Sequence, residues 1–256
     1  MTEFFDLTGQ VAIVIGGSGG IGHAVAIGLA KHGADVVVTA RTLNKLEPVA
    51  QEIRDLGKKS MAISSDVTDE RSIASMVDAV LAEFSHIDIL VNSAGLAIRK
   101  SAEELTIDEW RQVMDSNALG TFLCCQAVGR VMIKQNGGKI VNMSSIRAIL
   151  GTPMGAVAYG PSKGAVDALT RTLALEWANY NIFVNAVAPS LIETDLTRSL
   201  MSDPEKAKAR TARIPLGRVA EVEDIIGPVI FLASKASSFI TGQIIHIDGG
   251  TSAGIT

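Results

Sequence analysis

The sequence predicts an α/β fold in which a doubly wound parallel sheet of about seven strands carries helices on both faces. Short runs of β-branched residues alternate with longer stretches of helical periodicity from one end of the chain to the other. The 256 residues are 47% hydrophobic and only 4% aromatic, which suits a core of Val, Ile, Leu and Ala. No linker, repeat or low-complexity segment divides the chain, so we expect one domain over residues 1–256.

Each predicted strand is a short apolar run, as expected for strands buried on both faces of a parallel sheet. In chain order these runs are Val11–Ile15, Val36–Thr39, Met61–Ser64, Ile89–Asn92, Lys139–Met143, Phe183–Ala188 and Ile244–Ile247. Crossovers between parallel strands are right-handed, so the connecting helices must cover both faces of the sheet.

Helical periodicity marks the connections, notably Ile21–Lys31, Asp69–Phe84, Ile107–Gln135 and Val157–Tyr180. Thr106 followed by Glu109 predicts a capping box at the start of the third of these helices. Gly33 is placed to end the first one.

The stretch Ser190–Gly217 interrupts the alternation, with two short polar helices where a strand would be expected. Long excursions near the carboxyl ends of strands are often functional. We therefore expect a substrate lid at about residues 190–217.

Several protein classes are disfavoured by composition. The net charge of −4 is mixed along the chain, which counts against nucleic acid as a partner. Met1–Gln10 lacks the features of a signal peptide, and no apolar run is long enough to span a membrane. Cys124 and Cys125 are adjacent within a helical pattern, a poor geometry for a disulfide, so we expect a reduced cytoplasmic protein.

The first strand leads directly into a glycine-rich turn, residues 16–22, and a helix follows. Glycines here let the chain turn tightly and bring backbone N–H groups to a pyrophosphate at the helix N-terminus, as in a Rossmann fold. The alternative is a flexible turn, but the position between a first strand and a first helix favours a dinucleotide site. The predicted contacts are Gly16, Ser18, Gly19, Gly20, Ile21 and Gly22.

The second strand ends in Ala40-Arg41 rather than in an acidic residue. An acid at this point would bind the ribose 2′-hydroxyl of NAD, whereas Arg41 can hold a 2′-phosphate through charge-assisted hydrogen bonds. The sequence therefore favours NADP(H) over NAD(H); the alternative is a solvated arginine at a strand end.

Asp66 and Val67 follow the third strand. The Asp66 carboxylate can meet an adenine amino group, or it can simply cap the next helix.

Tyr159 and Lys163 are four residues apart in a helical pattern and share one helix face. A phenol ordinarily loses its proton near pH 10, and we expect the Lys163 ammonium to lower the pKa of Tyr159 so that it can act as an acid or base. Ser145 follows the fifth strand and can donate to a substrate oxygen. Such pairs also arise by chance on helix surfaces, so the weight of this one comes from its agreement with the nucleotide motif.

Together these motifs resemble the single-domain short-chain dehydrogenases/reductases over essentially the whole chain. The segments that carry the resemblance are Gly16–Gly22, Asp66-Val67, Asn92-Ser93-Ala94-Gly95, Asn117, Ser144-Ser145, Tyr159-Gly160-Pro161-Ser162-Lys163, Asn185–Pro189 and Ile247-Asp248-Gly249-Gly250.

The resemblance implies a catalytic tetrad and further cofactor contacts. Asn117 would support a proton-relay water, Ser145 and Tyr159 would hold the carbonyl oxygen, and Lys163 would bind the nicotinamide ribose and tune Tyr159. The other implied cofactor contacts are Val67 beside the adenine, Asn92, Ala94 and Gly95 on the adenosine side, and Pro189, Ile192 and Thr194 at the nicotinamide carboxamide.

Some positions depart from the family pattern. Ile15 replaces a threonine before the glycine loop, Ser93 replaces an asparagine, and Ser190 replaces a glycine. The spacing from Ser145 to Tyr159 is one residue longer than the commonest one. Each departure bears on cofactor binding or register, and none removes a catalytic group.

The substrate is less closely defined. Within the family the chain most resembles gluconate 5-dehydrogenases and related sugar-acid or polyol enzymes. Arg99 and Arg147 both follow predicted strands, on the side of the sheet edge where the catalytic residues are expected. Either can bind a carboxylate through bidentate hydrogen bonds; the alternative is that they face solvent or another subunit.

Other functions stay open. A 3-oxoacyl-thioester reductase would need a basic patch for an acidic carrier: Asn179-Tyr180-Asn181 counts against one, whereas Arg130, Lys134 and Lys139 keep it possible. A broad carbonyl reductase is a further alternative. A non-catalytic NADP-binding sensor is disfavoured because the tetrad is complete. The histidines and cysteines show no metal-ligand spacing, so we expect no metal.

The two long predicted helices Ile107–Gln135 and Val157–Tyr180 carry more apolar surface than one sheet can cover. By resemblance, we expect a homotetramer with two-fold axes.

Overall fold

A parallel seven-stranded sheet forms the centre of the protein, in the order β3-β2-β1-β4-β5-β6-β7. The computed structural model describes residues 2–152, 155–193, 197 and 202–254. Its strands are β1 (Val11–Ile15), β2 (Asp35–Ala40), β3 (Ser60–Ser64), β4 (Ile89–Asn92), β5 (Gly138–Met143), β6 (Ile182–Pro189) and β7 (Ile244–Ile247). The predicted doubly wound sheet is confirmed, with each strand end within one residue of its predicted position.

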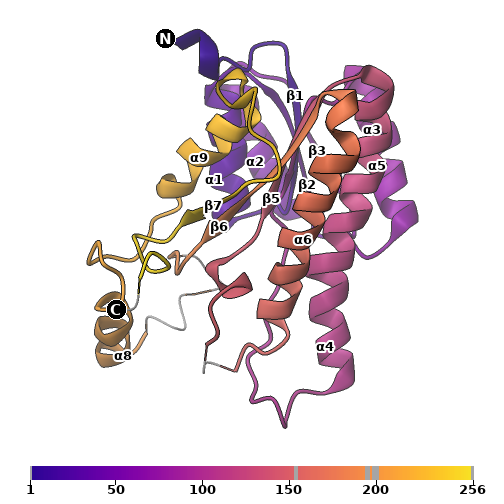
Figure 1. The fold of residues 1–256 in the computed structure, drawn as a ribbon. Coiled ribbons are helices and arrows are strands. Elements are labelled where there is room, and N and C mark those ends of the chain that lie inside the picture. Colours follow the sequence, from indigo (N-terminus) through magenta and orange to yellow (C-terminus); the bar gives the residue numbers. More distant parts are fainter. Residues whose placement is uncertain (1, 153–154, 194–196, 198–201, 255–256) are drawn as a thin grey trace.

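Helices cover both faces of this sheet (Figure 1). One face carries α1 (Gly20–Lys31), α2 (Leu43–Asp55) and α9 (Glu223–Ala233), and the other carries α3 (Glu70–Phe84), α5 (Gly120–Gln135) and α6 (Tyr159–Trp177). Side chains alternate along each strand. Accordingly Ala12 and Val14 of β1 join the hydrophobic core under α1, α2 and α9. Val11, Ile13 and Ile15 join the core under α3, α5 and α6.

Two predicted helix ends, at Thr106 and at Gly33, are confirmed, whereas α6 covers Tyr159–Trp177 rather than the predicted Val157–Tyr180. The Thr106 hydroxyl accepts from the Glu109 N–H, and the Glu109 carboxylate accepts from the Thr106 N–H, which makes the capping box. Gly33 follows the end of α1 with a φ of +108°, and a Cβ there would lie 2.6 Å from the Thr8 hydroxyl oxygen. Only glycine fits both the backbone angle and the space.

The prediction of one continuous helix over Ile107–Gln135 is wrong. The chain forms α4 (Ile107–Met114), then a π-helical segment over Asp115–Leu119, and only then α5. A π turn inserts one extra residue into the helix and turns the side chains after it. This widened turn contains Asn117, which is fully buried.

The predicted excursion near residues 190–217 contains one described helix, α8 (Pro204–Thr211). A second polar helix was also predicted in this stretch, of which residues 194–196 and 198–201 lie outside the described residues. The stretch that follows α8 is tied to the C-terminal segment, because Ile214 is buried and the Leu216 N–H donates to the Gly249 carbonyl.

Two further findings concern the whole fold. Within the described parts of the chain, no helix has the length and apolar character needed to cross a bilayer. Cys124 and Cys125 are both free and buried, so the predicted absence of a disulfide between them is confirmed.

Candidate active site

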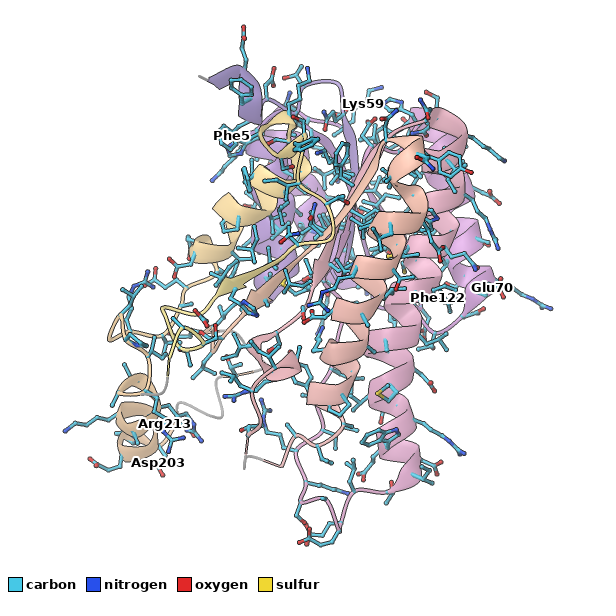
Figure 2. All side chains as sticks on the ribbon, viewed as in Figure 1. Phe5, Lys59, Glu70, Phe122, Asp203 and Arg213 are labelled. Atoms are coloured by element: carbon cyan, nitrogen blue, oxygen red, sulfur yellow. The ribbon has the colours of Figure 1, made fainter. Side chains whose placement is uncertain are left out.

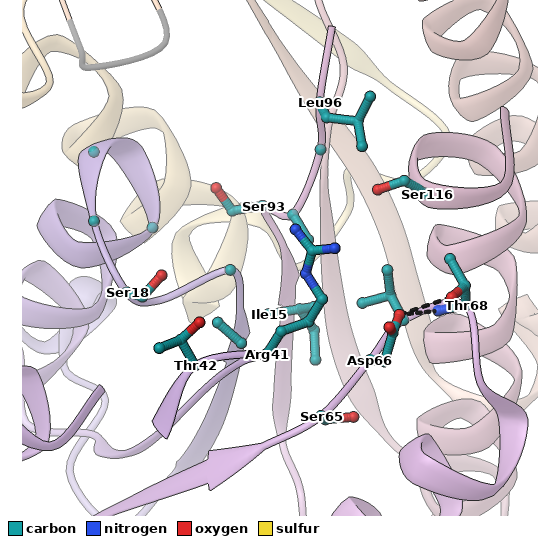
Figure 3. A pocket seen from close by; sticks show the side chains of 18 of the residues that line it. Ile15, Ser18, Arg41, Thr42, Ser65, Asp66, Thr68, Ser93, Leu96 and Ser116 are labelled. Carbon is teal, nitrogen blue, oxygen red and sulfur yellow. Dashed lines mark hydrogen bonds between the residues drawn. The ribbon is translucent and has the colours of Figure 1, made fainter. Parts of the chain in front are cut away.

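A cleft of about 660 Å³ opens at the carboxyl ends of β1, β2, β3 and β4 (Figure 3). In doubly wound sheets this edge is where ligands bind. The predicted cofactor residues that line the cleft are Gly16, Ser18, Gly19, Gly20, Ile21, Gly22, Arg41, Asp66, Val67, Ala94 and Gly95.

Parts of the glycine turn are packed too tightly for a side chain, most clearly at Gly16 and Gly22. A Cβ on Gly16, whose φ is +83°, would lie 2.7 Å from the Ala94 backbone nitrogen. No side chain caps the first turn of α1, which begins at Gly20. The N–H groups at that helix end therefore stay available to an anion such as a pyrophosphate.

Arg41 extends into this cleft, where Thr42 and Lys45 also line the wall (Figure 3). Lys45 lies four residues after Arg41, in the first turn of α2. The sequence analysis missed it, although a second base one turn beyond the first was a visible signal. Two cations at the end of β2 fit a phosphate better than a ribose hydroxyl.

Asp66 accepts hydrogen bonds from the Thr68 N–H and hydroxyl, at 2.9 Å and 2.8 Å. These bonds, and after them the charge of Arg41, hold the pKa of Asp66 below its ordinary value. The alternative that Asp66 caps α3 is wrong, because Asp69 occupies that position and accepts from the Arg71 N–H. Asp66 is thus an ionised carboxylate on the cleft wall.

Asn92 does not line the cleft. It is buried, and its amide nitrogen donates to the Asn142 side-chain oxygen at 2.9 Å, which joins β4 to β5. The implied contact of the Asn92 side chain with an adenosine is therefore not what the structure shows.

The proposed acid/base lies at the start of α6. Tyr159 is the first residue of that helix, and Lys163 follows one turn later with its ammonium 5.7 Å from the centre of the Tyr159 ring. The Lys163 ammonium donates to the Met143 carbonyl at 2.7 Å. Ser145, two residues beyond that carbonyl, hydrogen bonds with the Tyr159 phenol.

Asn117 holds the loop after β4 against α6. Its side-chain oxygen accepts from the Leu96 N–H, and its amide donates to the Leu96 carbonyl and the Ser162 hydroxyl, at 2.8, 2.9 and 3.0 Å. A Cβ on Gly95 would lie 3.2 Å from the Asn117 side-chain oxygen and 3.6 Å from the Lys163 ammonium. The structure thus brings all four predicted catalytic residues to one edge of the sheet.

The expected lowering of the Tyr159 pKa by Lys163 is wrong for this state of the protein. Burial raises the pKa of Tyr159, against the opposing effects of the Ser145 hydrogen bond and the charges of Arg99 and Arg147. Burial also lowers the pKa of Lys163 to about 8, while Asp167 opposes that shift. Desolvation outweighs the pair interaction because both groups are withdrawn from water.

Arg99 and Arg147 act electrostatically on the Tyr159 phenol, and Arg213 beyond α8 acts on Arg147. Figure 2 shows Arg213 at the end of α8. None of the three has a carboxylate partner among the residues that the structure describes; Arg147 donates only to the Gly151 carbonyl, at 3.1 Å. Two guanidinium groups whose charges act on the Tyr159 phenol, with a third whose charge acts on Arg147, favour an anionic ligand.

The remaining predicted contacts are only partly described. Pro189 ends β6, and its carbonyl accepts from the Ser145 hydroxyl at 3.4 Å. Ile192 is buried and bridges to Ala220. Thr194 lies outside the described residues. In the described ranges no group of three or more His, Cys, Asp and Glu side chains is placed to hold a metal ion.

Comparisons with known proteins agree with this geometry. A family model described as enoyl-(acyl carrier protein) reductase matches residues 16–252. The gluconate 5-dehydrogenase of Gluconobacter oxydans is 38% identical over 248 residues, 97% of this chain and 96% of that protein. The 3-oxoacyl-acyl-carrier-protein reductase of Synechocystis sp. is 38% identical over 246 residues, 95% and 97% of the two chains.

A solved structure is similar over the whole chain. The gluconate 5-dehydrogenase of Burkholderia cenocepacia J2315, in complex with NADP and tartrate, is 37% identical, with a TM-score of 0.95 and 99% of both chains covered. The fold, the site and these relatives define an oxidoreductase that acts on CH–OH groups. The chain belongs to the short-chain dehydrogenase/reductase family.

Proposed function

We propose that the protein is an NADP(H)-dependent oxidoreductase that interconverts a ketone and a secondary alcohol on a sugar acid, a polyol or a related compound. The observation that carries the substrate class is the set of arginines around Tyr159, which has no carboxylate partner among the described residues. The named activities of relatives over the whole chain support the same class.

The cleft fits NADP(H). Free N–H groups at the start of α1 would hold the pyrophosphate, and Arg41 with Lys45 would hold the 2′-phosphate. Lys163 would hold the nicotinamide ribose, and Ala94 and Val67 would face the adenosine. When bound, the nicotinamide supplies or accepts the hydride.

The chain's own residues handle the substrate oxygen. In the reducing direction the Tyr159 hydroxyl donates a proton to the carbonyl oxygen, while the Ser145 hydroxyl donates a hydrogen bond to the same oxygen. The raised pKa of Tyr159 keeps its proton available for this step. Asn117 and Lys163 would line the path along which a proton from solvent reaches Tyr159 and restores its hydroxyl.

We infer that Arg99 and Arg147 bind the substrate carboxylate. A sugar acid carries its carboxylate away from the reacting carbon, and the charges of Arg99 and Arg147 both act on the Tyr159 phenol, so a carboxylate held by them would lie near the acid/base. A similar gluconate 5-dehydrogenase has been solved in complex with tartrate, a small dicarboxylate, which is consistent in kind with an acid substrate.

A second candidate is reduction of a 3-oxoacyl thioester, which the Synechocystis relative favours. Within one chain, the bases that would form a carrier patch are poorly placed for it. The Lys139 ammonium is engaged by the Ser237 carbonyl and hydroxyl and lies 3.8 Å from the centre of the Phe183 ring. Arg130 and Lys134 lie toward the C-terminal end of α5, near the strands' amino ends.

We further propose that residues 1–256 form one domain whose excursion near 190–217 closes over the substrate, and that the protein is a homotetramer. Exposed apolar residues support a subunit contact on this side: Phe122 lies on α5 (Figure 2), and Leu175 lies on α6. Light scattering that gave the mass of a monomer would contradict the assembly.

The test is purified protein with NADPH or NADH and a panel of ketones, followed by the loss of reduced-nicotinamide absorbance. The panel holds 5-keto-gluconate, a ketohexose, an acetoacetyl thioester and a bulky aromatic ketone. Turnover of the keto acid with NADPH supports the proposal, and turnover of only the thioester supports the second candidate.

A further inference from the structure

A buried carboxylate lies directly behind the proposed catalytic residues. Asp167 is on α6, one helical turn beyond Lys163, and is 4% exposed. The Ser144 hydroxyl donates to its Oδ1 at 2.5 Å. A buried, ionisable group with a single hydrogen bond is costly for the fold, so its presence calls for a compensating role.

Asp167 and Lys163 together fasten the end of β5 to α6. The Lys163 ammonium donates to the Met143 carbonyl, and the next residue, Ser144, donates to Asp167. Ser145 follows at once. The two bonds therefore fix the backbone that presents the Ser145 hydroxyl to Tyr159.

The charges that act on Asp167 come from two elements: Lys163 and Arg171 lie on its own helix, and His246 is on β7. Among the described residues, its hydrogen-bond partner is the Ser144 hydroxyl after β5. Burial raises the pKa of Asp167, while Ser144, Arg171, His246 and Lys163 all favour the carboxylate form. No ion pair within 4.0 Å joins Asp167 to any described residue, so its effect on Lys163 is a through-space one.

We propose that Asp167 is a positioning residue for the reaction: its carboxylate keeps the neighbouring Lys163 ammonium charged and, through Ser144, holds Ser145 in place. This inference rests on the proposed roles of Tyr159, Lys163 and Ser145. Lys163 is as buried as Asp167, and within the described part of the chain the hydrogen-bond partner of its ammonium is the neutral Met143 carbonyl. Asp167 is thus the carboxylate placed to offset the loss of water around the ammonium.

The Asp167 charge should shift the pKa of Lys163 and the pKa of Tyr159 in the same direction. A negative charge nearby raises the pKa of an ammonium and of a phenol alike. In the proposed reaction, loss of the proton from either Tyr159 or Lys163 lowers the rate, so the alkaline limb of the pH profile follows the pKa values of these two groups. Removing the Asp167 charge must lower those pKa values.

The experiment measures kcat/KM for ketone reduction by NADPH as a function of pH in the full-length protein. Asp167→Asn is nearly isosteric and can still accept the Ser144 hydrogen bond. We expect its alkaline limb to move to lower pH by about one unit. Asp167→Glu keeps the charge and should leave the limb within a few tenths of a unit of wild type.

Ser144→Ala is the second test, and it covers the case in which Asp167→Asn does not fold. Ser144→Ala removes the bond that links Asp167 to the backbone before Ser145, so kcat/KM should fall while the alkaline limb stays in its wild-type place. Wild-type kcat/KM in Ser144→Ala, or an alkaline limb in Asp167→Asn that stays where the wild type has it, would overturn the inference.

Lys163→Met separates this inference from the proposed function. If Lys163→Met retains wild-type turnover, the proposed function itself fails. If Lys163→Met is inactive and Asp167→Asn keeps the wild-type alkaline limb, only the role given to Asp167 fails.

Discussion

The ammonium of Lys163 lies 5.7 Å from the centre of the Tyr159 ring and is directed at the Met143 carbonyl, not at the phenol. The pair shares one helix face, yet the two groups do not form a direct hydrogen bond with each other. Tyr159 is instead hydrogen bonded to Ser145 and surrounded by arginine charges. The proton donor is therefore held in its neutral form, as reduction of a carbonyl requires.

This arrangement predicts how activity depends on pH. Burial lowers the pKa of Lys163 to about 8, so its ammonium is charged below that pH and neutral above it. Because we assign the charged form to cofactor binding, kcat/KM for NADPH in the reducing direction should fall as the pH rises through about 8. A profile that stays flat well into the alkaline range would contradict the role given to Lys163.

The cofactor preference depends on the end of β2. Arg41→Ala should weaken NADPH binding by roughly 1–3 kcal/mol and leave NADH nearly unaffected, because only NADPH carries the 2′-phosphate. Lys45→Ala should act in the same direction and less strongly. Titration of each reduced nucleotide by fluorescence measures both effects.

Lys31→Ala, at the far end of α1, is the matched control and should bind both nucleotides as wild type does. If wild-type protein preferred NADH, the interpretation of Arg41 would be wrong.

The substrate class depends on the arginines. Arg99→Ala and Arg147→Ala should each raise KM for a keto acid about tenfold and leave KM for a neutral ketone within about twofold, because each removes a charge-assisted contact with the carboxylate alone. Arg130→Ala, on the exposed side of α5, serves as the control. Equal changes for acid and neutral substrates would remove the carboxylate role.

Buried parallel strands could be predicted closely from the sequence because each is a contiguous apolar run with polar or glycine residues at its ends. Val11–Ile15 and Ile244–Ile247 match the predicted bounds fully. The nucleotide turn was equally visible, because its glycines are required by contacts that are local to β1 and α1 or to the neighbouring strand end.

Features set by tertiary contacts were missed. The period of apolar residues is almost the same on both sides of the π turn at Asn117, so the pattern shows one helix where the backbone makes a widened turn. The inward orientation of Asn92 depends on Asn142 of another strand. The pKa of Tyr159 depends on how far it is buried, which residue spacing cannot reveal.

The most direct test of the account compares wild-type protein with Tyr159→Phe in the reduction of 5-keto-gluconate by NADPH. The substitution removes only the hydroxyl, so NADPH binding should stay nearly unchanged while turnover falls by about 10²–10⁴-fold. Turnover by Tyr159→Phe close to that of the wild type would contradict the assignment of Tyr159 as the acid/base.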